Sequence, residues 1–172
     1  MPSKQQLLCW WRMTNNQYSL PKWHPATILL TWFHSGLSPI APGTCGSLAA
    51  IPFAWMIITL GGYWTFLAVL GVLFVLGVWF SHWAVEKLEE KDPQVIVLDE
   101  VVGQGLVLVV APITPISYLL AFVLFRLFDI FKPWPICLVD KKMKTGLGIM
   151  LDDLIAGFYG AISLFLILSI ME

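Results

Sequence analysis

Apolar residues dominate the chain from residue 26 onward, and only short segments that are polar or rich in Gly and Pro interrupt them. The apolar stretches that read as helices lie at residues 47–60, 63–85, 100–111, 113–131 and 153–171. Residues 63–85 are long enough for a transmembrane helix of about 20 residues. Residues 47–60 and 100–111 are shorter, so they either extend beyond these bounds or pack inside the bundle as half-spans. The pattern predicts an all-α integral membrane protein, a compact bundle of about five short transmembrane helices.

The N-terminal part of the chain is less regular. A brief apolar stretch at residues 26–33 is followed by residues 34–46, where two prolines and three glycines break regular structure. Irregular backbone at membrane depth is tolerated only inside protein or along a wet cavity. We therefore expect an N-terminal interfacial or re-entrant helix, followed by a helix with Ser47 as its N-cap. The expected organisation is a single membrane domain over 1–172, with an N-terminal cytoplasmic tail at 1–25 and a helical bundle at 26–172.

The composition agrees with a membrane protein. Hydrophobic residues make up 58% of the 172 residues and charged residues 12%, whereas soluble proteins carry roughly 25% charged residues. The net charge of −1 and the lack of a basic stripe argue against a nucleic-acid partner. Three widely spaced cysteines without a CxxC pair predict neither a disulfide framework nor a zinc site.

The basic residues predict the topology. All ten Lys and Arg residues fall within residues 4–22, 87–91 and 126–144, and the connections at 61–62 and 112–115 contain none. If these three basic segments lie in the cytoplasm, the chain obeys the positive-inside rule. We therefore expect a multi-pass protein whose loops at 86–98 and 132–150 are cytoplasmic.

Acidic residues gather on the same predicted side, where helices begin or end. The candidates for catalysis and for metal binding are Asp99, Glu100, Asp129, Asp152 and Asp153. Carboxylates at membrane depth are costly and are functional candidates by default, and clustered carboxylates repel one another unless a cation binds between them. Oxygen ligands alone favour a hard ion such as Mg²⁺. Each pair alone could instead cap a helix, but three such sites on one face of a chain with few charges favour a metal cluster.

Groups that suit an anion lie beside these acids. Arg126, Asp129 and Lys132 are spaced three apart and share a helix face if the helix continues that far, although such a pair is more often a structural salt bridge. The glycine-containing segment 43–47 leads into a predicted helix, whose N-terminus favours negative charge. The candidate phosphate-binding residues are Arg126, Lys132, Gly43, Thr44, Gly46 and Ser47.

Four segments resemble the signature blocks of the phosphatidylglycerophosphatase A family, in the family's order and at similar spacing. They are SPIAPGTCGSL (38–48), DPQVIVLDEVVGQ (92–104), FRLFDIFKPWPI (125–136) and GLGIMLDDLIAG (146–157). The resemblance covers about residues 34–160. It departs from the family at Thr145, where the family usually has the first glycine of a Gly-Gly-x-Gly run.

The resemblance implies a reaction. Members of this family hydrolyse the phospholipid phosphatidylglycerophosphate to phosphatidylglycerol and inorganic phosphate, with Mg²⁺, at the cytoplasmic face of a bacterial inner membrane. A water molecule activated by the metal is the preferred nucleophile, and an aspartyl-phosphate intermediate is the alternative. A metal-dependent lipid head-group transferase is disfavoured because the DGxxAR…GxxxDxxxD signature is absent. A small ion-binding transporter would carry its acids near mid-span.

Overall fold

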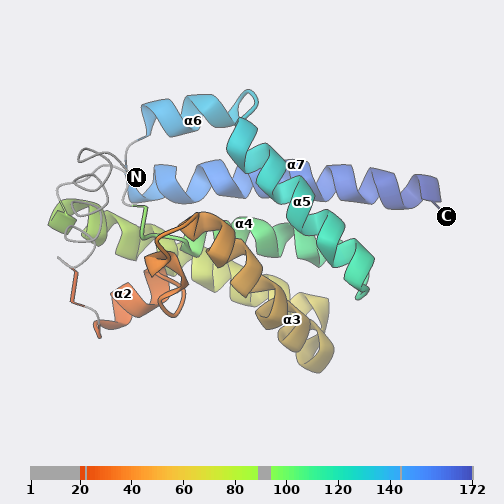
Figure 1. Cartoon of the computed structure of the whole chain (residues 1–172), viewed down its shortest axis with the longest axis horizontal. Helices are drawn as coiled ribbons and strands as arrows, with labels where there is room; N and C mark the ends of the chain where they lie inside the picture. Colours follow the sequence, from red (N-terminus) through yellow and green to blue (C-terminus); the bar gives the residue numbers. More distant parts are fainter. Residues whose placement is uncertain (1–19, 22, 89–93, 144, 172) are drawn as a thin grey trace, which may run out of the picture.

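The computed structural model describes residues 20–21, 23–88, 94–143 and 145–171. Within these residues every regular element is helical (Figure 1), which confirms the all-α prediction for the described part of the chain. The elements are α2 (Pro25–Leu30), the 3₁₀ helix η2 (Ser35–Leu37), α3 (Pro42–Leu88), α4 (Leu98–Val109), α5 (Pro115–Phe131), α6 (Ile136–Lys142) and α7 (Gly146–Met171). Most of the predicted tail at 1–25 lies outside the described residues.

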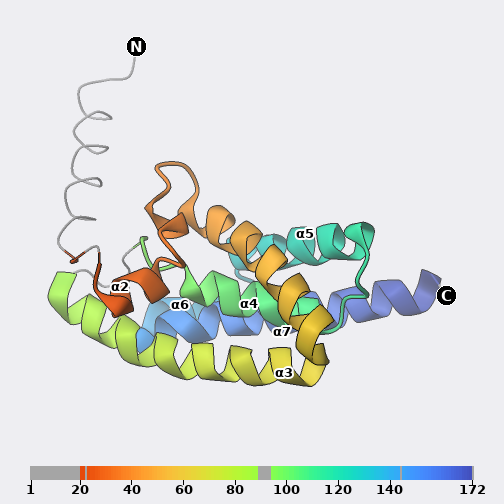
Figure 2. The same ribbon diagram turned by 90° about the horizontal axis from the view of Figure 1, so that it is seen from below.

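Helix α4 is short and lies inside the bundle. Its 12 residues rise by about 18 Å, well short of the roughly 30 Å hydrocarbon core of a bilayer. It packs against α3, α5 and α7 (Figure 2). Its buried side chains include Val101, Val102, Val107 and Leu108. Of the two possibilities for this stretch, packing inside the bundle is the one that the structure shows.

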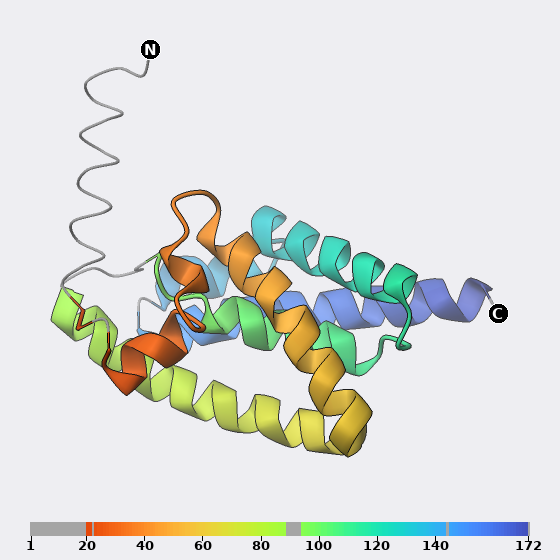
Figure 3. The ribbon, with the colours of Figure 1, turned by 60° about the horizontal axis from the view of Figure 1, so that its bottom comes forward.

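Helix α3 consists of two limbs joined at a sharp bend. At Gly62 the backbone has φ 78° and ψ 172°, a conformation that is essentially restricted to glycine. The limbs before and after this residue run in different directions (Figure 3). The turn predicted at residues 61–62 is confirmed, and so are the two helices expected on either side of it.

Two described helical segments are long and apolar enough to cross a membrane, Pro42–Lys87 and Gly146–Ile170. Only 28% of the most apolar 18-residue window of each is buried within the protein. Large exposed side chains on these helices include Leu60, Trp64 and Ile170. These features suit a membrane protein, and the five-span arrangement stays a prediction.

Three features of the helices differ from what the sequence pattern predicted. Helix α3 begins at Pro42 and not at Ser47, because proline is well suited to the first turn of a helix. Helix α7 begins at Gly146, seven residues before the predicted start. Helix α6 lies in a segment that was expected to be a loop. In each case Pro and Gly residues that the pattern marks as breaks lie close to the start of a helix.

Candidate active site

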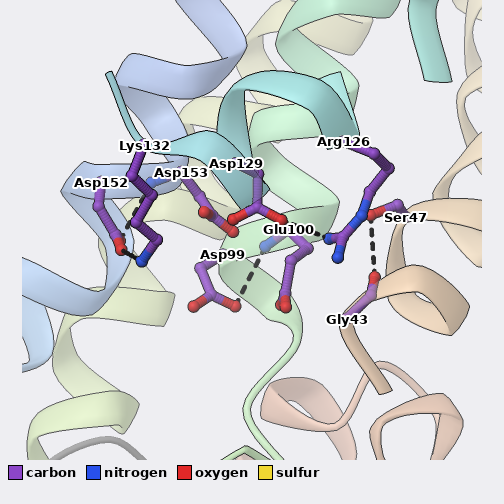
Figure 4. A network of polar contacts seen from close by, with 9 residues as sticks. All are labelled: Gly43, Ser47, Asp99, Glu100, Arg126, Asp129, Lys132, Asp152 and Asp153. Carbon is purple, nitrogen blue, oxygen red and sulfur yellow. Dashed lines mark hydrogen bonds and ion pairs between the residues drawn. The ribbon is translucent and has the colours of Figure 1, made fainter. Parts of the chain in front are cut away.

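The five predicted acidic residues come together at one end of the bundle. Asp99 and Glu100 lie in the first turn of α4, Asp129 in the last turn of α5, and Asp152 and Asp153 in the second turn of α7. Figure 4 shows these side chains gathered around one region. Because α7 begins well before Asp152, neither residue of the Asp152-Asp153 pair caps a helix. The capping explanation therefore fails for this pair.

Three of the acids form the centre of the site, which we call the carboxylate trio: Asp99, Glu100 and Asp153. One carboxylate oxygen from each lies within 4.8 Å of the other two. Asp99 and Asp153 are buried, and Glu100 is half-buried. The Oε2 atom of Glu100 has no hydrogen-bond partner among the described residues. Three negative charges this close repel one another strongly away from bulk water, so the trio favours a bound cation.

The other two acids are paired with basic side chains. Arg126 Nη1 lies 2.6 Å from Asp129 Oδ2, and Lys132 Nζ lies 2.6 Å from Asp152 Oδ2. The two pairs flank the trio on opposite sides (Figure 4). In the part of the chain that the structure describes, no member of the trio itself has a salt-bridge partner. The site therefore separates into two acids that have a salt-bridge partner and three that make no salt bridge within the described residues.

The start of α3 packs closely against Glu100 and Arg126. A Cβ atom at Gly43 would overlap the Glu100 carboxylate and would lie 3.3 Å from Arg126 Nη1. Only glycine lets the helix approach this closely. Arg126 Nε is buried without an acceptor in the described structure. The first turn of α3, the half-buried Arg126 guanidinium and the Glu100 carboxylate therefore lie side by side.

Not every predicted phosphate-binding amide lies in this first turn. The N–H of Cys45 donates to Ala41 O at 3.1 Å and so begins the helical hydrogen bonds. Gly43 and Thr44 therefore keep the unpaired amides of a helix start, whereas Gly46 and Ser47 lie within the helix. The Ser47 hydroxyl donates to the Gly43 carbonyl at 2.9 Å, so the prediction of Ser47 as an N-cap is wrong.

Lys132 lies on the opposite side of the trio from Arg126. Helix α5 ends at Phe131, and Lys132 follows as its C-cap in the left-handed conformation, with φ 42°. Pro133 disfavours the right-handed helical conformation in the residue before it. The helix therefore does not continue to Lys132, and the condition under which Arg126 and Lys132 would share one helix face is not met. Both residues nevertheless border the trio (Figure 4).

The sequence pattern gave no indication of the residues that hold the start of α4. The buried Val97, just before the trio residues Asp99 and Glu100, donates its N–H to Leu30 O at 2.9 Å. Cβ atoms placed at Gly36 and Gly46 would each lie within 3.1 Å of the Val97 side chain. These contacts attach α2, η2 and the start of α3 to the residue that leads into the site. Gly46 in the first resembling segment and Gly36 just before that segment were the available signal, but only the fold shows what they approach.

This arrangement can bind a hard cation and an anionic group side by side. The trio supplies oxygen ligands alone, which suit Mg²⁺ or Ca²⁺. Arg126 and Lys132 supply positive charge on either side, and the helix start of α3 adds two amides. A phosphate ester needs such a combination, because its charge must be compensated during hydrolysis.

Comparison with known proteins identifies the chain. Residues 28–168 match the family model described as Phosphatidylglycerophosphatase A. A protein of that name from Escherichia coli K12 is 40% identical over 140 residues, which cover 81% of this chain and 79% of the relative. One from Haemophilus influenzae is 39% identical over 145 residues, which cover 84% of this chain and 89% of the relative.

A third relative, from Bacteroides thetaiotaomicron, is provisionally named a phosphatidylinositol-3-phosphatase. It is 38% identical over 138 residues, which cover 77% of this chain and 86% of the relative. No solved structure matches the chain significantly. The helical fold with its site of acids and flanking cations thus belongs to a phosphatase, an enzyme that hydrolyses phosphate esters. The chain belongs to the phosphatidylglycerophosphatase A family.

Proposed function

We propose that this enzyme hydrolyses phosphatidylglycerophosphate to phosphatidylglycerol and inorganic phosphate, and that it uses Mg²⁺ held by the carboxylate trio. The observation that carries the proposal is the trio itself. None of its members makes a salt bridge within the described residues, and the trio lies between two ion pairs in a chain of this family. The names of the relatives from Escherichia coli and Haemophilus influenzae support the choice of substrate.

The residues present fit a magnesium ion. Mg²⁺ prefers carboxylate oxygens and keeps several waters, so three carboxylates suffice to hold it. The buried Glu100 Oε2 atom lacks a hydrogen-bond partner among the described residues, and a cation would satisfy it. When bound, the ion would stabilise charge on the phosphoryl oxygens and would make a water molecule easier to deprotonate. Of the five acids predicted as ligands, the geometry favours Asp99, Glu100 and Asp153.

The remaining charged groups of the site hold and orient the phosphate. Arg126 would bind one phosphoryl oxygen through Nε, which is buried without an acceptor in the described structure, and the Gly43 and Thr44 amides would bind another. Asp129 fixes the direction of the guanidinium, and Asp152 fixes that of the Lys132 ammonium. Lys132 offsets phosphoryl charge from the other side. Together these residues compensate the charge of a phosphomonoester dianion that three carboxylates would otherwise repel.

We further propose that the site lies at the cytoplasmic surface of a bacterial inner membrane. Trp23, Phe33 and Trp134 are exposed, and aromatic side chains are enriched at membrane interfaces. The confinement of all Lys and Arg residues to three segments supports a cytoplasmic orientation. A lipid phosphate presented at that surface would reach the trio without leaving the bilayer.

The name of the Bacteroides relative favours a second substrate class, a phosphatidylinositol phosphate. The two substrates share a phosphomonoester on a lipid and differ in the alcohol that carries it. A glycerol head group is smaller than an inositol ring. Competition between the two lipids for the enzyme therefore shows which head group the site prefers.

The test is phosphate release by the purified protein in detergent micelles. We expect turnover of phosphatidylglycerophosphate with Mg²⁺, formation of phosphatidylglycerol detected by mass spectrometry, and loss of activity with EDTA. Phosphatidylinositol 3-phosphate and glycerol 3-phosphate are the comparison substrates. Faster turnover of the inositol lipid would replace the proposed substrate, and full activity in EDTA would remove the metal from the proposal.

A further inference from the structure

Helices α4 and α7 touch backbone to backbone directly beside the carboxylate trio. A Cβ atom at Gly157 would lie 2.5 Å from the carbonyl oxygen of Gly103 and 3.1 Å from its Cα and carbonyl carbon. A Cβ atom at Gly103 would lie 2.5 Å from the carbonyl oxygen of Asp153. Real side chains do not come this close, so only a glycine at each position permits the observed crossing.

The two glycines at the crossing lie one helical turn from two acids of the trio. Gly103 follows Asp99 by four residues on α4, and Gly157 follows Asp153 by four residues on α7. Residues four apart lie on the same face of a helix, one turn from each other. The glycine pair is therefore one turn further into the bundle than the acids, on the faces that bring the two helices together. The separation of the helices at the glycines sets the separation of the carboxylates.

We propose that Gly103 and Gly157 are positioning residues that hold Asp99 and Glu100 close enough to Asp153 for a small cation, and so make the site prefer Mg²⁺ to Ca²⁺. The inference rests on the proposed metal site and assigns its selectivity to a helix crossing. Mg²⁺ requires ligands at about 2.0–2.1 Å, whereas Ca²⁺ accepts about 2.3–2.6 Å and flexible geometry. A slightly wider site would therefore lose Mg²⁺ first.

The size of the change follows from the contact at Gly157. Ordinary van der Waals contact begins near 3.4 Å, and the added Cβ of Gly157→Ala would lie 2.5 Å from a backbone oxygen. To bring this contact to 3.0–3.4 Å, the two backbones must move apart by about 0.5–0.9 Å. This is as large as, or larger than, the roughly 0.2–0.6 Å by which calcium ligand distances exceed those of magnesium. A side-chain rotation cannot relieve these contacts, because the three nearest neighbours of the added atom are all backbone atoms of Gly103.

Two other glycines provide matched controls. Gly160 lies on the same side of α7, just under one turn beyond Gly157, and a Cβ there would lie 2.8 Å from Val107 Cγ2, a side-chain atom that can move. Gly160→Ala therefore disturbs the same interface farther from the acids. Gly71 lies on α3 with nothing within 4 Å of an added Cβ. Gly71→Ala therefore shows the effect of a Gly→Ala change that creates no close contact.

The experiment is isothermal titration calorimetry of the purified proteins with MgCl₂ and, separately, with CaCl₂. We expect Gly157→Ala to weaken Mg²⁺ binding roughly 10- to 100-fold, the range found when groups that orient metal ligands are altered. Calcium binding should weaken by a smaller factor, and Gly160→Ala and Gly71→Ala should stay within about threefold of the wild type for both ions.

A further variant checks the geometry. Asp153→Glu lengthens the carboxylate arm by one methylene group, so it should recover part of the Mg²⁺ affinity in the Gly157→Ala protein while weakening it in the wild type. If Gly157→Ala does not fold, Gly103→Ala with Phe125→Leu makes the same test, because the second change removes the side-chain part of that contact.

The outcomes separate this inference from the proposed function. A wild-type protein that binds no Mg²⁺ would overturn the metal site on which the inference depends. A wild type that binds Mg²⁺, together with a folded Gly157→Ala protein of unchanged affinity and unchanged preference over Ca²⁺, would overturn the role of the crossing alone. An equal loss in Gly160→Ala would also overturn it, because general loosening of the interface would then explain the effect.

Discussion

The Lys132–Asp152 ion pair offers a test of whether the flanking cations act on the substrate or only hold the fold. The two charged atoms lie 2.6 Å apart, and the side chains are 29% and 10% exposed. Lys132→Met removes the ammonium group and keeps most of the apolar stem. Asp152 then loses its ion pair with Lys132 next to the trio, and the proposed phosphate site loses one cationic contact.

The expected loss follows from these contacts. A hydrogen bond to a charged group contributes roughly 1.5–3 kcal/mol, which corresponds to about a ten- to more than a hundredfold change in kcat/KM. If Lys132 acts on the phosphoryl group in the transition state, kcat falls along with kcat/KM. The assay is steady-state phosphate release in micelles, with thermal unfolding measured on the same samples.

A double variant separates the two roles. Adding Asp152→Asn to Lys132→Met removes the buried carboxylate that the first change leaves behind, so the melting temperature should partly recover. If Lys132 binds the phosphate as proposed, activity should stay low, because that cation is still missing. Recovery of kcat/KM to within about threefold of the wild type in the double variant would show that the pair is only structural. A change below about threefold in folded Lys132→Met alone would leave Lys132 as a lipid anchor.

Three further predictions follow from the fold and the site. Gly43→Ala should lower kcat/KM by on the order of 100-fold with little change in the melting temperature, because its Cβ would displace the Glu100 carboxylate; activity near the wild-type level would contradict the close packing at the start of α3. Gly62→Ala should destabilise the protein by about 1–3 kcal/mol, because φ 78° with ψ 172° strains any other residue, and an unchanged unfolding midpoint would count against the bend. A cysteine introduced at position 142 should resist a membrane-impermeant thiol reagent in intact cells and react after permeabilisation, and labelling without permeabilisation would reverse the proposed orientation.

The apolar pattern was sufficient to predict most of the helices. The turn at residues 61–62 and the hairpin from α4 to α5 could be predicted because Gly and Pro interrupt long apolar stretches there. The starts of α3 and α7 could not, because the pattern treats Pro42 and Gly146 as breaks, whereas proline favours a first turn and Gly146 packs against the backbone of α3 near His82. A break in the pattern therefore marks the vicinity of a helix start and not the residue itself.

The identity of the acids was predictable, but their division of roles was not. Asp99, Glu100 and Asp153 form the trio, whereas Asp129 and Asp152 bind basic partners. The Lys132–Asp152 contact joins residues 20 positions apart and depends on the left-handed backbone at Lys132, which spacing does not encode. The approach of Gly43 to Glu100 depends likewise on tertiary packing. Local signals name the candidate residues, and only the fold determines which of them meet.

The most direct test of the central claim is the Mg²⁺ dependence of phosphate release from phosphatidylglycerophosphate by the wild type and by Asp153→Asn. Asp153 contributes to the trio and makes no salt bridge within the described structure. We expect the wild type to saturate with Mg²⁺, and the folded variant to need roughly 10- to 100-fold more Mg²⁺ or to lose activity altogether. A folded Asp153→Asn protein with wild-type turnover at limiting Mg²⁺ would contradict the assignment of the carboxylate trio as the metal site of this phosphatase.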